Sequence, residues 1–456
     1  MHTRAPSRPS TMAVARPLPT VCPGVWPPPT TMAALPSTRL PIGGAGYCGR
    51  KPEEPTQPVS ETWNVRSIFG MAASLAPPFY RGPATCASAS RSGGATCYTT
   101  ARRQIRKSPR EDDPMAMLTR VALTALALIG AVVSPAIAQT TTLTMSSWVS
   151  PQHHLTAVVL QGWANEVEKA TGGRVKLTML PKHPSAPPGT FDAVRDGLVD
   201  VSYVTASYTP ARHILPLMAE LPGAGDTALV NSVAYSRIYW KHFHAVGEYK
   251  GVKLLGVFTH GPGQMFTKRP VHGIADVQGL KIRTGGGVAE AVAKALGAAA
   301  FVKPAPESYE LLKGGVADGV FFPLESIISF KLETVLEQAT LFPGGMYSSA
   351  FGFFMNEDKW NKLSKEDQAA IEKVSGEHLA RLAGRSWDEA DAKGLEALKK
   401  SGVKIVTADP AFAAEVAKRS APIVDDWIKK ASAKGVDAAK ILAEFRAELK
   451  KVAAGQ

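Results

Sequence analysis

Apolar and polar residues alternate along the middle of the chain with two periods, which predicts strands and helices in turn. Strand-like stretches with a period of two lie at residues 143–148, 175–179, 199–204, 254–259 and 281–283. Helical stripes follow several of them, at residues 155–167, 191–197 and 288–296. The first stripe is followed by Gly172 and Gly173, a residue type that commonly ends helices. This order of strand, helix and strand predicts α/β architecture with parallel sheets.

From about Asn356 onward the pattern becomes almost entirely helical. Ser364 and Asp367 have the spacing of an N-terminal capping box, and they predict the start of one very long helix that runs toward Lys400. Gly402 predicts its end. A short strand at 403–406 and two closing helices, at about 410–430 and 436–452, complete the chain.

The first 114 residues follow neither period. They are rich in Pro, Ser, Arg, Thr and Gly, with three consecutive prolines at 27–29 and a basic run at 102–110. Such a segment buries too little apolar surface to offset the entropy lost on ordering. We interpret residues 1–114 as a non-native extension upstream of the true start or as a disordered N-terminal arm.

Residues 115–138 have the three parts of a secretory signal peptide. Arg120 precedes an apolar run at 121–133, and Ala136-Ile137-Ala138 forms a small-residue cleavage site. The run is shorter than the roughly 20 residues that a membrane span needs. We therefore expect cleavage after Ala138 and a periplasmic mature protein of residues 139–456 that is not itself embedded in a membrane.

The formal net charge of +13 does not predict a nucleic-acid-binding protein. Residues 1–114 carry +8 of it, and the rest of the chain carries +5 without any stretch that interleaves aromatic and basic residues. All 4 cysteines also lie within the first hundred residues. The predicted mature part therefore has no disulfide, no thiol nucleophile and no cysteine ligand for a metal.

Signatures of catalysis are missing from the sequence. It contains no HExxH, GxSxG or Walker motif, and the glycines at 285–287 do not have the spacing of a dinucleotide fingerprint. His153 and His154 could bind a metal, but an adjacent pair more often forms local hydrogen bonds or faces solvent. We therefore predict no enzymatic activity, no cofactor and no metal.

Residues 279–287, with the sequence GLKIRTGGG, form the best local candidate for a binding site. Arg283 ends a predicted strand directly before a glycine-rich turn that opens a helix. Its planar guanidinium matches a carboxylate, and the helix N-terminus adds partial positive charge. On spacing alone, an arginine in a surface salt bridge is the alternative.

Five segments, spread in order over nearly the whole predicted mature chain, resemble one protein family. They lie at residues 170–176, 191–200, 266–283, 307–319 and 360–368. Together they resemble the dicarboxylate-receptor-like substrate-binding proteins of tripartite ATP-independent periplasmic (TRAP) transporters. The resemblance implies an α/β, two-lobed periplasmic binding protein fold, with a long helix spanning both lobes and a ligand cleft between them. It implies lobe I at 139–262 and 348–387, and lobe II at 263–347 and 388–456.

In that family the arginine matching Arg283 forms a bidentate ion pair with the carboxylate of the ligand. The resemblance therefore implies a receptor that takes up a small organic carboxylate and delivers it to a small and a large membrane subunit. An ABC-type or a sensor-linked solute-binding protein would share the fold and the compartment. A periplasmic enzyme on the same fold is a third, less favoured alternative.

Two departures from the family pattern indicate a less polar pocket. Phe322, next to Phe321, stands where many members have an amide, and Gln264 stands where some have a second arginine. Both changes favour a ligand with one carboxylate and an apolar or aromatic body, unless the two phenylalanines only pack the core. Three further candidates lie where predicted strands end: Trp148, His154 and Tyr208.

Overall fold

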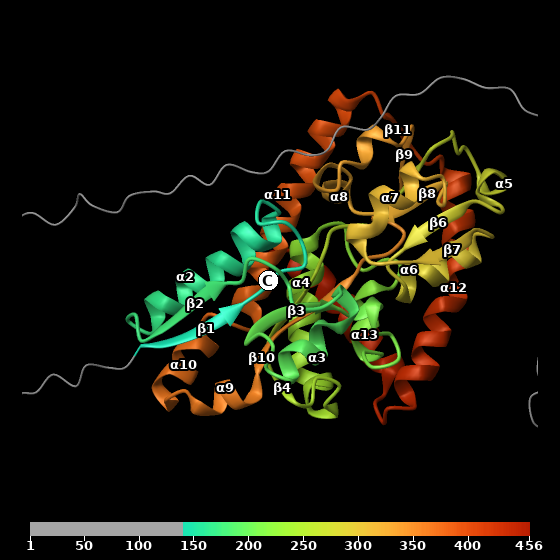
Figure 1. Ribbon diagram of the computed structural model, residues 1–456. Helices are drawn as coiled ribbons and strands as arrows, with labels where there is room; N and C mark the ends of the chain where they lie inside the picture. Colours follow the sequence, from blue (N-terminus) through green and yellow to red (C-terminus); the bar gives the residue numbers. More distant parts are fainter. Residues whose placement is uncertain (1–139) are drawn as a thin grey trace, which may run out of the picture. The chain divides into compact units, whose positions relative to one another are not determined.

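The computed structural model describes residues 140–456, which are drawn in colour in Figure 1. The predictions for the extension at 1–114 and for the signal peptide lie outside the described residues. Within the described part, no helix is both long enough and apolar enough to cross a membrane.

The first sheet has five strands in the order β2-β1-β3-β10-β4. Three of them are parallel neighbours: β1 (Thr141–Met145), β2 (Val175–Met179) and β3 (Val201–Thr205). β10 (Ala350–Asn356) lies antiparallel between β3 and β4 (Val252–Thr259). The prediction of purely parallel sheets is therefore wrong, because the chain returns from the second sheet and inserts β10 in the opposite direction.

The second sheet has six strands in the order β11-β9-β5-β8-β6-β7. Its strand β5 runs antiparallel to β8 and β9, and the remaining neighbours are parallel. The six are β5 (Gln264–Thr267), β6 (Lys281–Thr284), β7 (Ala299–Val302), β8 (Gly319–Phe322), β9 (Gln338–Leu341) and β11 (Lys404–Thr407). We call the first sheet with the helices packed on it lobe I, and the second sheet with its helices lobe II.

The predicted helical stripes are confirmed. The first forms a π-helical segment (Leu155–Leu160) that continues as α2 (Gln161–Ala170), and it ends at Gly172 and Gly173, which have φ of 59° and 80°. The other two are α3 (Thr190–Arg195) and α6 (Gly287–Ala295). In lobe II, α7 (Ser308–Lys313) lies within the segment 307–319, which resembles a helix and turn of the family, whereas the short helix α5 (Ile274–Val277) was not predicted.

Gly376 interrupts the predicted long helix. Ser364 accepts a hydrogen bond from the backbone N–H of Asp367, as the capping box requires, but it opens only α10 (Lys365–Lys373). Gly376 then takes φ of 59°, which a continuing right-handed helix cannot contain, and α11 (Glu377–Ser401) starts after it. Gly402 ends α11 as predicted, with φ of 86°. A further short helix, α9 (Glu357–Lys362), precedes α10.

α11 is the long helix that spans both lobes (Figure 1). It packs against α4 (Ala228–Ile238) of lobe I and against α8 (Leu324–Ser329) of lobe II. Glycines permit close approach at both contacts. A Cβ atom on Gly384 would lie 2.6 Å from the Cα of Leu229, and one on Gly394 would lie 2.9 Å from the Cα of Glu325.

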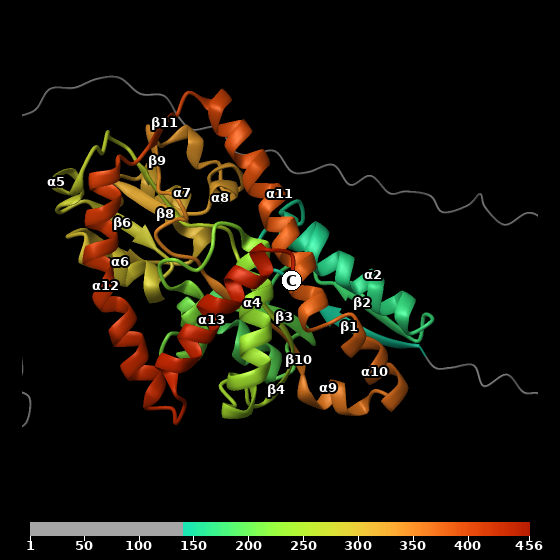
Figure 2. The ribbon, with the colours of Figure 1, turned by 180° about the vertical axis from the view of Figure 1, so that it is seen from behind.

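The two C-terminal helices pack on different lobes. α12 (Pro410–Ser432) contacts α6 of lobe II, whereas α13 (Ala438–Ala453) lies against α4 of lobe I (Figure 2). The residue boundaries predicted for the two lobes remain a proposal.

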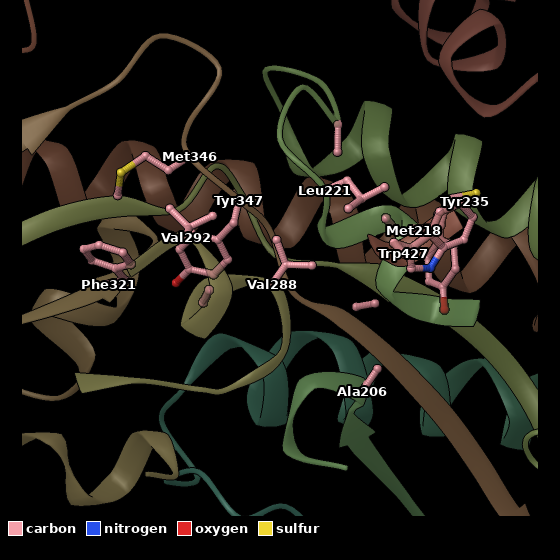
Figure 3. Close-up of a cluster of buried hydrophobic side chains, with 14 of the residues drawn as sticks. Ala206, Met218, Leu221, Tyr235, Val288, Val292, Phe321, Met346, Tyr347 and Trp427 are labelled. Atoms are coloured by element: carbon pink, nitrogen blue, oxygen red, sulfur yellow. The ribbon is translucent and has the colours of Figure 1, made fainter. Parts of the chain in front are cut away.

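A continuous apolar core connects the lobes. It includes Met218 and Leu221 of lobe I together with Val288 and Val292 of α6 and Phe321 of β8 (Figure 3). Burial of this shared surface holds the strand ends of the two sheets on either side of one cavity.

Candidate functional site

A narrow cavity lies between the strand ends of the two lobes. Its volume is about 50 Å³. Its wall is mostly apolar and aromatic, with a few convergent polar groups, as is usual for small-molecule sites. The apolar lining residues are Trp148, Val149, Leu155, Ala305, Phe322, Pro323, Phe330, Phe351 and Trp387.

Arg283, on β6, is the cationic group of the cavity wall. Its side chain is only 1% exposed. Nε and Nη2 donate to the carbonyl oxygen of Lys303 at 2.9 and 2.6 Å. Among residues 140–456, no carboxylate lies within ion-pair distance of the guanidinium.

The unpaired guanidinium is costly without a ligand. Burial lowers the pKa of Arg283, the direction expected for a cation removed from water. A buried charge is tolerated only when it is paired and hydrogen-bonded. A bound carboxylate would supply both the counter-charge and two acceptor oxygens.

Tyr208 lies beside Arg283 and contacts both lobes. Its hydroxyl oxygen accepts a hydrogen bond from the backbone N–H of Ala305 at 2.8 Å. Burial raises the pKa of Tyr208, so the group remains a hydroxyl that can donate to a ligand. Gly285 completes this end of the cavity. A Cβ there would lie 3.4 Å from Cε1 of Tyr208 and 4.0 Å from Nη2 of Arg283.

Aromatic rings form the remaining wall. Trp148 lies 5.8 Å from Tyr208 between ring centroids, and Phe322 stacks on Phe330 at 5.7 Å. The indole Nε1 of Trp148 is buried and has no hydrogen-bond partner among the described residues. A flat apolar body would fit against these rings.

Four of the seven predicted site residues line the cavity: Arg283, Phe322, Trp148 and Tyr208. Gln264, Phe321 and His154 lie outside its lining. Gln264 is tied to Phe342, whose N–H donates to Oε1 at 2.7 Å and whose carbonyl accepts from Nε2 at 3.3 Å. Neighbouring residues of a strand point to opposite faces of the sheet, and Phe322 faces the cavity. Phe321 therefore points away from the cavity and is fully buried in the core of Figure 3.

His153, rather than His154, lines the cavity. His154 is directed at α11, where its Nδ1 lies 2.8 Å from Oγ of Ser386. Sequence analysis could not separate two adjacent histidines in a loop. No sequence pattern pointed to Phe330, directly after α8, or to Trp387, within α11, although both line the cavity.

His153, His154 and Glu325 lie within 4.8 Å of one another, as a metal site would require. However, Nδ1 of His153 accepts from the N–H of Leu155 at 3.2 Å, so the proton resides on Nε2, which lies 3.2 Å from Oε1 of Glu325. That nitrogen then has no lone pair for a metal. The two imidazole rings are also stacked, 4.7 Å apart at 25°, and do not converge. A hydrogen-bonded network between the lobes fits this geometry better.

At the N-terminus of α6, the N–H of Val288 lies 3.4 Å from Oε2 of Glu220, so an internal carboxyl group faces this helix end. Gly285, in the turn before α6, lines the cavity, and the contribution of this turn and helix end to anion binding stays a prediction.

Comparisons with known proteins identify the family. Residues 145–430 match the model of "Bacterial extracellular solute-binding protein, family 7". The protein TsaT of Comamonas testosteroni, described as an outer membrane transporter protein, is 32% identical over 71% of this chain and 96% of its own.

Solved structures agree with this match. A TRAP periplasmic solute-binding protein from Bordetella bronchiseptica, with bound (R)- and (S)-mandelate, is 50% identical over 68% of this chain and 99% of its own, with a TM-score of 0.67. A marine metagenome TRAP protein specific for aromatic acids, in complex with 3-hydroxybenzoate, is 30% identical over 69% of this chain and 99% of its own, with a TM-score of 0.65. The predicted two-lobed fold and the predicted family are thus confirmed, and the chain belongs to family 7 of the bacterial extracellular solute-binding proteins, the receptor proteins of TRAP transporters.

Proposed function

We propose that this protein is a receptor for a small monocarboxylate with an aromatic or similarly apolar body. Arg283 binds the carboxylate in a bidentate ion pair, and Tyr208 donates a further hydrogen bond to it. The body of the ligand lies against Trp148, Phe322 and Phe330.

One observation carries this proposal. Arg283 is a nearly fully buried cation in a cavity wall, and the part of the chain that the structure describes supplies no carboxylate to pair with it. The energetic cost of that arrangement is relieved by an anionic ligand and by little else. A ligand with one acid group suffices, because the rest of the wall is largely apolar.

The relatives support an aromatic ligand. The Bordetella protein binds mandelate and the metagenome protein binds 3-hydroxybenzoate, and each of these acids has one carboxylate and one ring. The cavity of this protein, with its several aromatic side chains, offers stacking and edge contacts to such a ring.

The receptor acts without chemical turnover. In the cavity wall, the imidazole of His153 already binds Glu325 and Leu155, and Ser326 donates to Glu325 at 3.0 Å. A base poised beside a nucleophile would be needed for acyl transfer or hydrolysis. Testing candidate acids for turnover separates the receptor from a periplasmic enzyme on the same fold.

The family supports a proposal for the partners and the compartment. The pattern at 115–138 supports export to the periplasm, with cleavage after Ala138, and TRAP receptors deliver their ligand to membrane subunits. Closure of the two lobes around the acid would give those subunits a form to recognise. The family match argues against an ABC-type or sensor-linked partner, and neighbouring genes for a small and a large membrane protein would test the TRAP pairing.

Isothermal titration of the exported protein with benzoate, (R)- and (S)-mandelate, succinate and glucose tests the ligand class. We expect an aromatic acid to bind, and at about 100 times its Kd to stabilise the fold by about 2.7 kcal/mol. Arg283→Ala should abolish this binding. Arg237→Ala is the matched control, because Arg237 forms ion pairs with Glu377 and Glu448 away from the cavity. Binding of glucose alone, or unchanged binding by Arg283→Ala, would exclude the proposed anchor.

A further inference from the structure

Glu220 is a buried carboxyl group close to the cavity that the proposed binding mode does not use. It ends a short 3-10 helix (Leu215–Glu220) of lobe I and is 0% exposed. Across residues 140–456, no cationic side chain lies within ion-pair distance of it. Burial raises the pKa of Glu220 to about 8. Burying a carboxyl group without a cationic partner costs folding free energy, and the contacts that this group makes in return indicate its role.

The carboxyl group joins three separate segments. Oε1 accepts from the N–H of Ala350, at the start of β10, at 3.0 Å. Oε2 lies 3.4 Å from the N–H of Val288, in the first turn of α6 in lobe II. The backbone oxygen of Glu220 also accepts from the N–H of Ser348 at 3.2 Å. Glu220 thus connects lobe I to the helix that follows the Arg283 strand.

The glycine turn before α6 fits tightly against this carboxyl group. Gly287 has φ of 56°, and a Cβ on it would lie 2.9 Å from Oε2 of Glu220 and 2.7 Å from Cβ of Ser207. Gly286 has φ of 91°, and its Cβ would lie 2.7 Å from the carbonyl oxygen of Ser207. The turn therefore has little room to shift along the surface of lobe I.

The same turn carries the anion site. Arg283 lies two residues before Gly285, and Tyr208 directly follows Ser207. A Cβ on Gly285 would be in van der Waals contact with the Tyr208 ring, at 3.4 Å. The position of the turn relative to Ser207 consequently sets the spacing between Arg283 and Tyr208.

We propose that Glu220 is a positioning residue for ligand binding. By accepting from Ala350 and Val288, it fixes residues 285–287 against Ser207 and holds Arg283 and Tyr208 at the spacing that a carboxylate requires. Glu220 itself does not line the cavity. This inference rests on the proposed function of Arg283 as the carboxylate anchor.

The alternative is that Glu220 only stabilises the fold, and Glu248 provides the matched comparison. Its carboxyl group is 4% exposed and accepts from the N–H of Leu215, at the other end of the same 3-10 helix, at 3.0 Å. It lies 3.5 Å from Lys434 and does not line the cavity. Loss of Glu248 should therefore lower stability without changing the anion site.

The first measurement is benzoate affinity by titration calorimetry on the exported protein. We expect Glu220→Ala to weaken binding about tenfold or more, since two backbone donors lose their acceptor. Glu220→Gln keeps an oxygen for Ala350 but turns its NH2 toward Val288. Its affinity for benzoate should therefore lie between that of the wild type and that of Glu220→Ala. Glu248→Ala should lower Tm and keep the wild-type Kd. Unchanged affinity in Glu220→Ala, or an equal loss in Glu248→Ala, overturns the proposal.

The second measurement needs no ligand. Hydrogen exchange of a peptide covering residues 284–292 should accelerate in Glu220→Gln and Glu220→Ala but not in Glu248→Ala, because the Val288 N–H and the turn lose their support. If wild-type protein fails to bind benzoate, the proposed function is at fault, and this comparison still decides the role of Glu220. Unchanged exchange in both Glu220 variants would refute it. If Glu220→Ala does not fold, Glu220→Gln serves both measurements.

Discussion

The guanidinium carbon of Arg283 lies 4.3 Å from the centroid of the Phe322 ring. The phenyl face therefore covers the cation that we propose as the carboxylate anchor, and the same ring stacks on Phe330. A desolvated cation over an aromatic face gains about 1–2 kcal/mol. We therefore propose two roles for Phe322, as a wall for the apolar body of the ligand and as a support that orients Arg283.

Replacing Phe322 by leucine should weaken the binding of an aromatic acid about tenfold, because both the ring contact and the cover over Arg283 are lost. Titration calorimetry with benzoate checks this. Phe321→Leu is the control: its ring is 0% exposed in the core, so that variant should lose stability and keep its affinity. Equal losses of benzoate affinity in both variants would contradict the proposal that the Phe322 ring contacts the ligand directly.

The two phenylalanines also show how far sequence analysis could go. Its comparison with a known family placed an aromatic residue near the anchor, but β8 has only four residues and all of them are buried. A strand buried on both faces has no alternation of polar and apolar positions, so nothing local distinguishes Phe321 from Phe322. Only the pairing of β8 with its neighbours sets which ring faces the cavity.

The same limit applies to the fold. Strands β1 to β4 and β6 were predicted, although β3 is buried at every position, as β10 is. What sets β10 apart is its place in the sheet, since a long-range return of the chain inserts it between β3 and β4. Gly376 was passed over because a single glycine within a helical pattern is often tolerated. Its left-handed φ is required by the packing around it, where its N–H donates to the carbonyl of Leu255 in β4.

Two buried carboxyl groups predict that the ligand-free protein loses stability as the pH rises above neutral. Burial raises the pKa of Glu220 and of Asp391 to about 8, from 4.5 and 3.8 respectively. The folded state therefore holds protons that the unfolded chain has released between these values. Their stabilising contribution is complete below about pH 4 and is lost as the pH rises through about 8.

Buried histidines act in the opposite direction, but at lower pH. Burial lowers the pKa of His260 to about 4 and that of His154 to about 2, from 6.5. They destabilise the fold only below about pH 6.5, where the unfolded chain takes up protons. Between pH 6.5 and 8 the carboxyl groups should dominate, each contributing about 1.5 kcal/mol of lost stability.

Thermal denaturation from pH 6.5 to 8.5 measures this slope. Asp391→Asn should reduce the slope by about half, since its neutral amide releases no proton while Glu220 still does. Glu389→Gln, an exposed position on the same helix, should leave it unchanged. A wild-type Tm that is constant over this range would contradict the prediction.

Gly287→Ala should destabilise the fold by about 3 kcal/mol and weaken acid binding, because it adds overpacking to an unfavourable φ of 56°. Gly435→Ala measures the destabilisation that comes from the unfavourable φ alone, because φ is 85° there and a Cβ would meet nothing within 4 Å. That variant should lose only about 1 kcal/mol and bind normally. Urea denaturation gives the free energy of unfolding of each variant. Similar losses of stability in the two variants would mean that the contact of residue 287 with Ser207 and Glu220 is unimportant.

Tyr208→Phe should reduce affinity for an aromatic acid about fivefold to tenfold, because the variant loses the hydroxyl proposed to contact the ligand and leaves the N–H of Ala305 without its acceptor. That N–H belongs to lobe II and Tyr208 to lobe I, so part of the loss should come from a closed form that is less stable. Tyr235→Phe is the matched control, since the Tyr235 hydroxyl is buried without a partner among the described residues. Removing it should leave Kd unchanged and Tm equal or higher. If Tyr208→Phe binds as tightly as the wild type, Arg283 alone holds the carboxylate, and the contact between Tyr208 and Ala305 contributes nothing to closure.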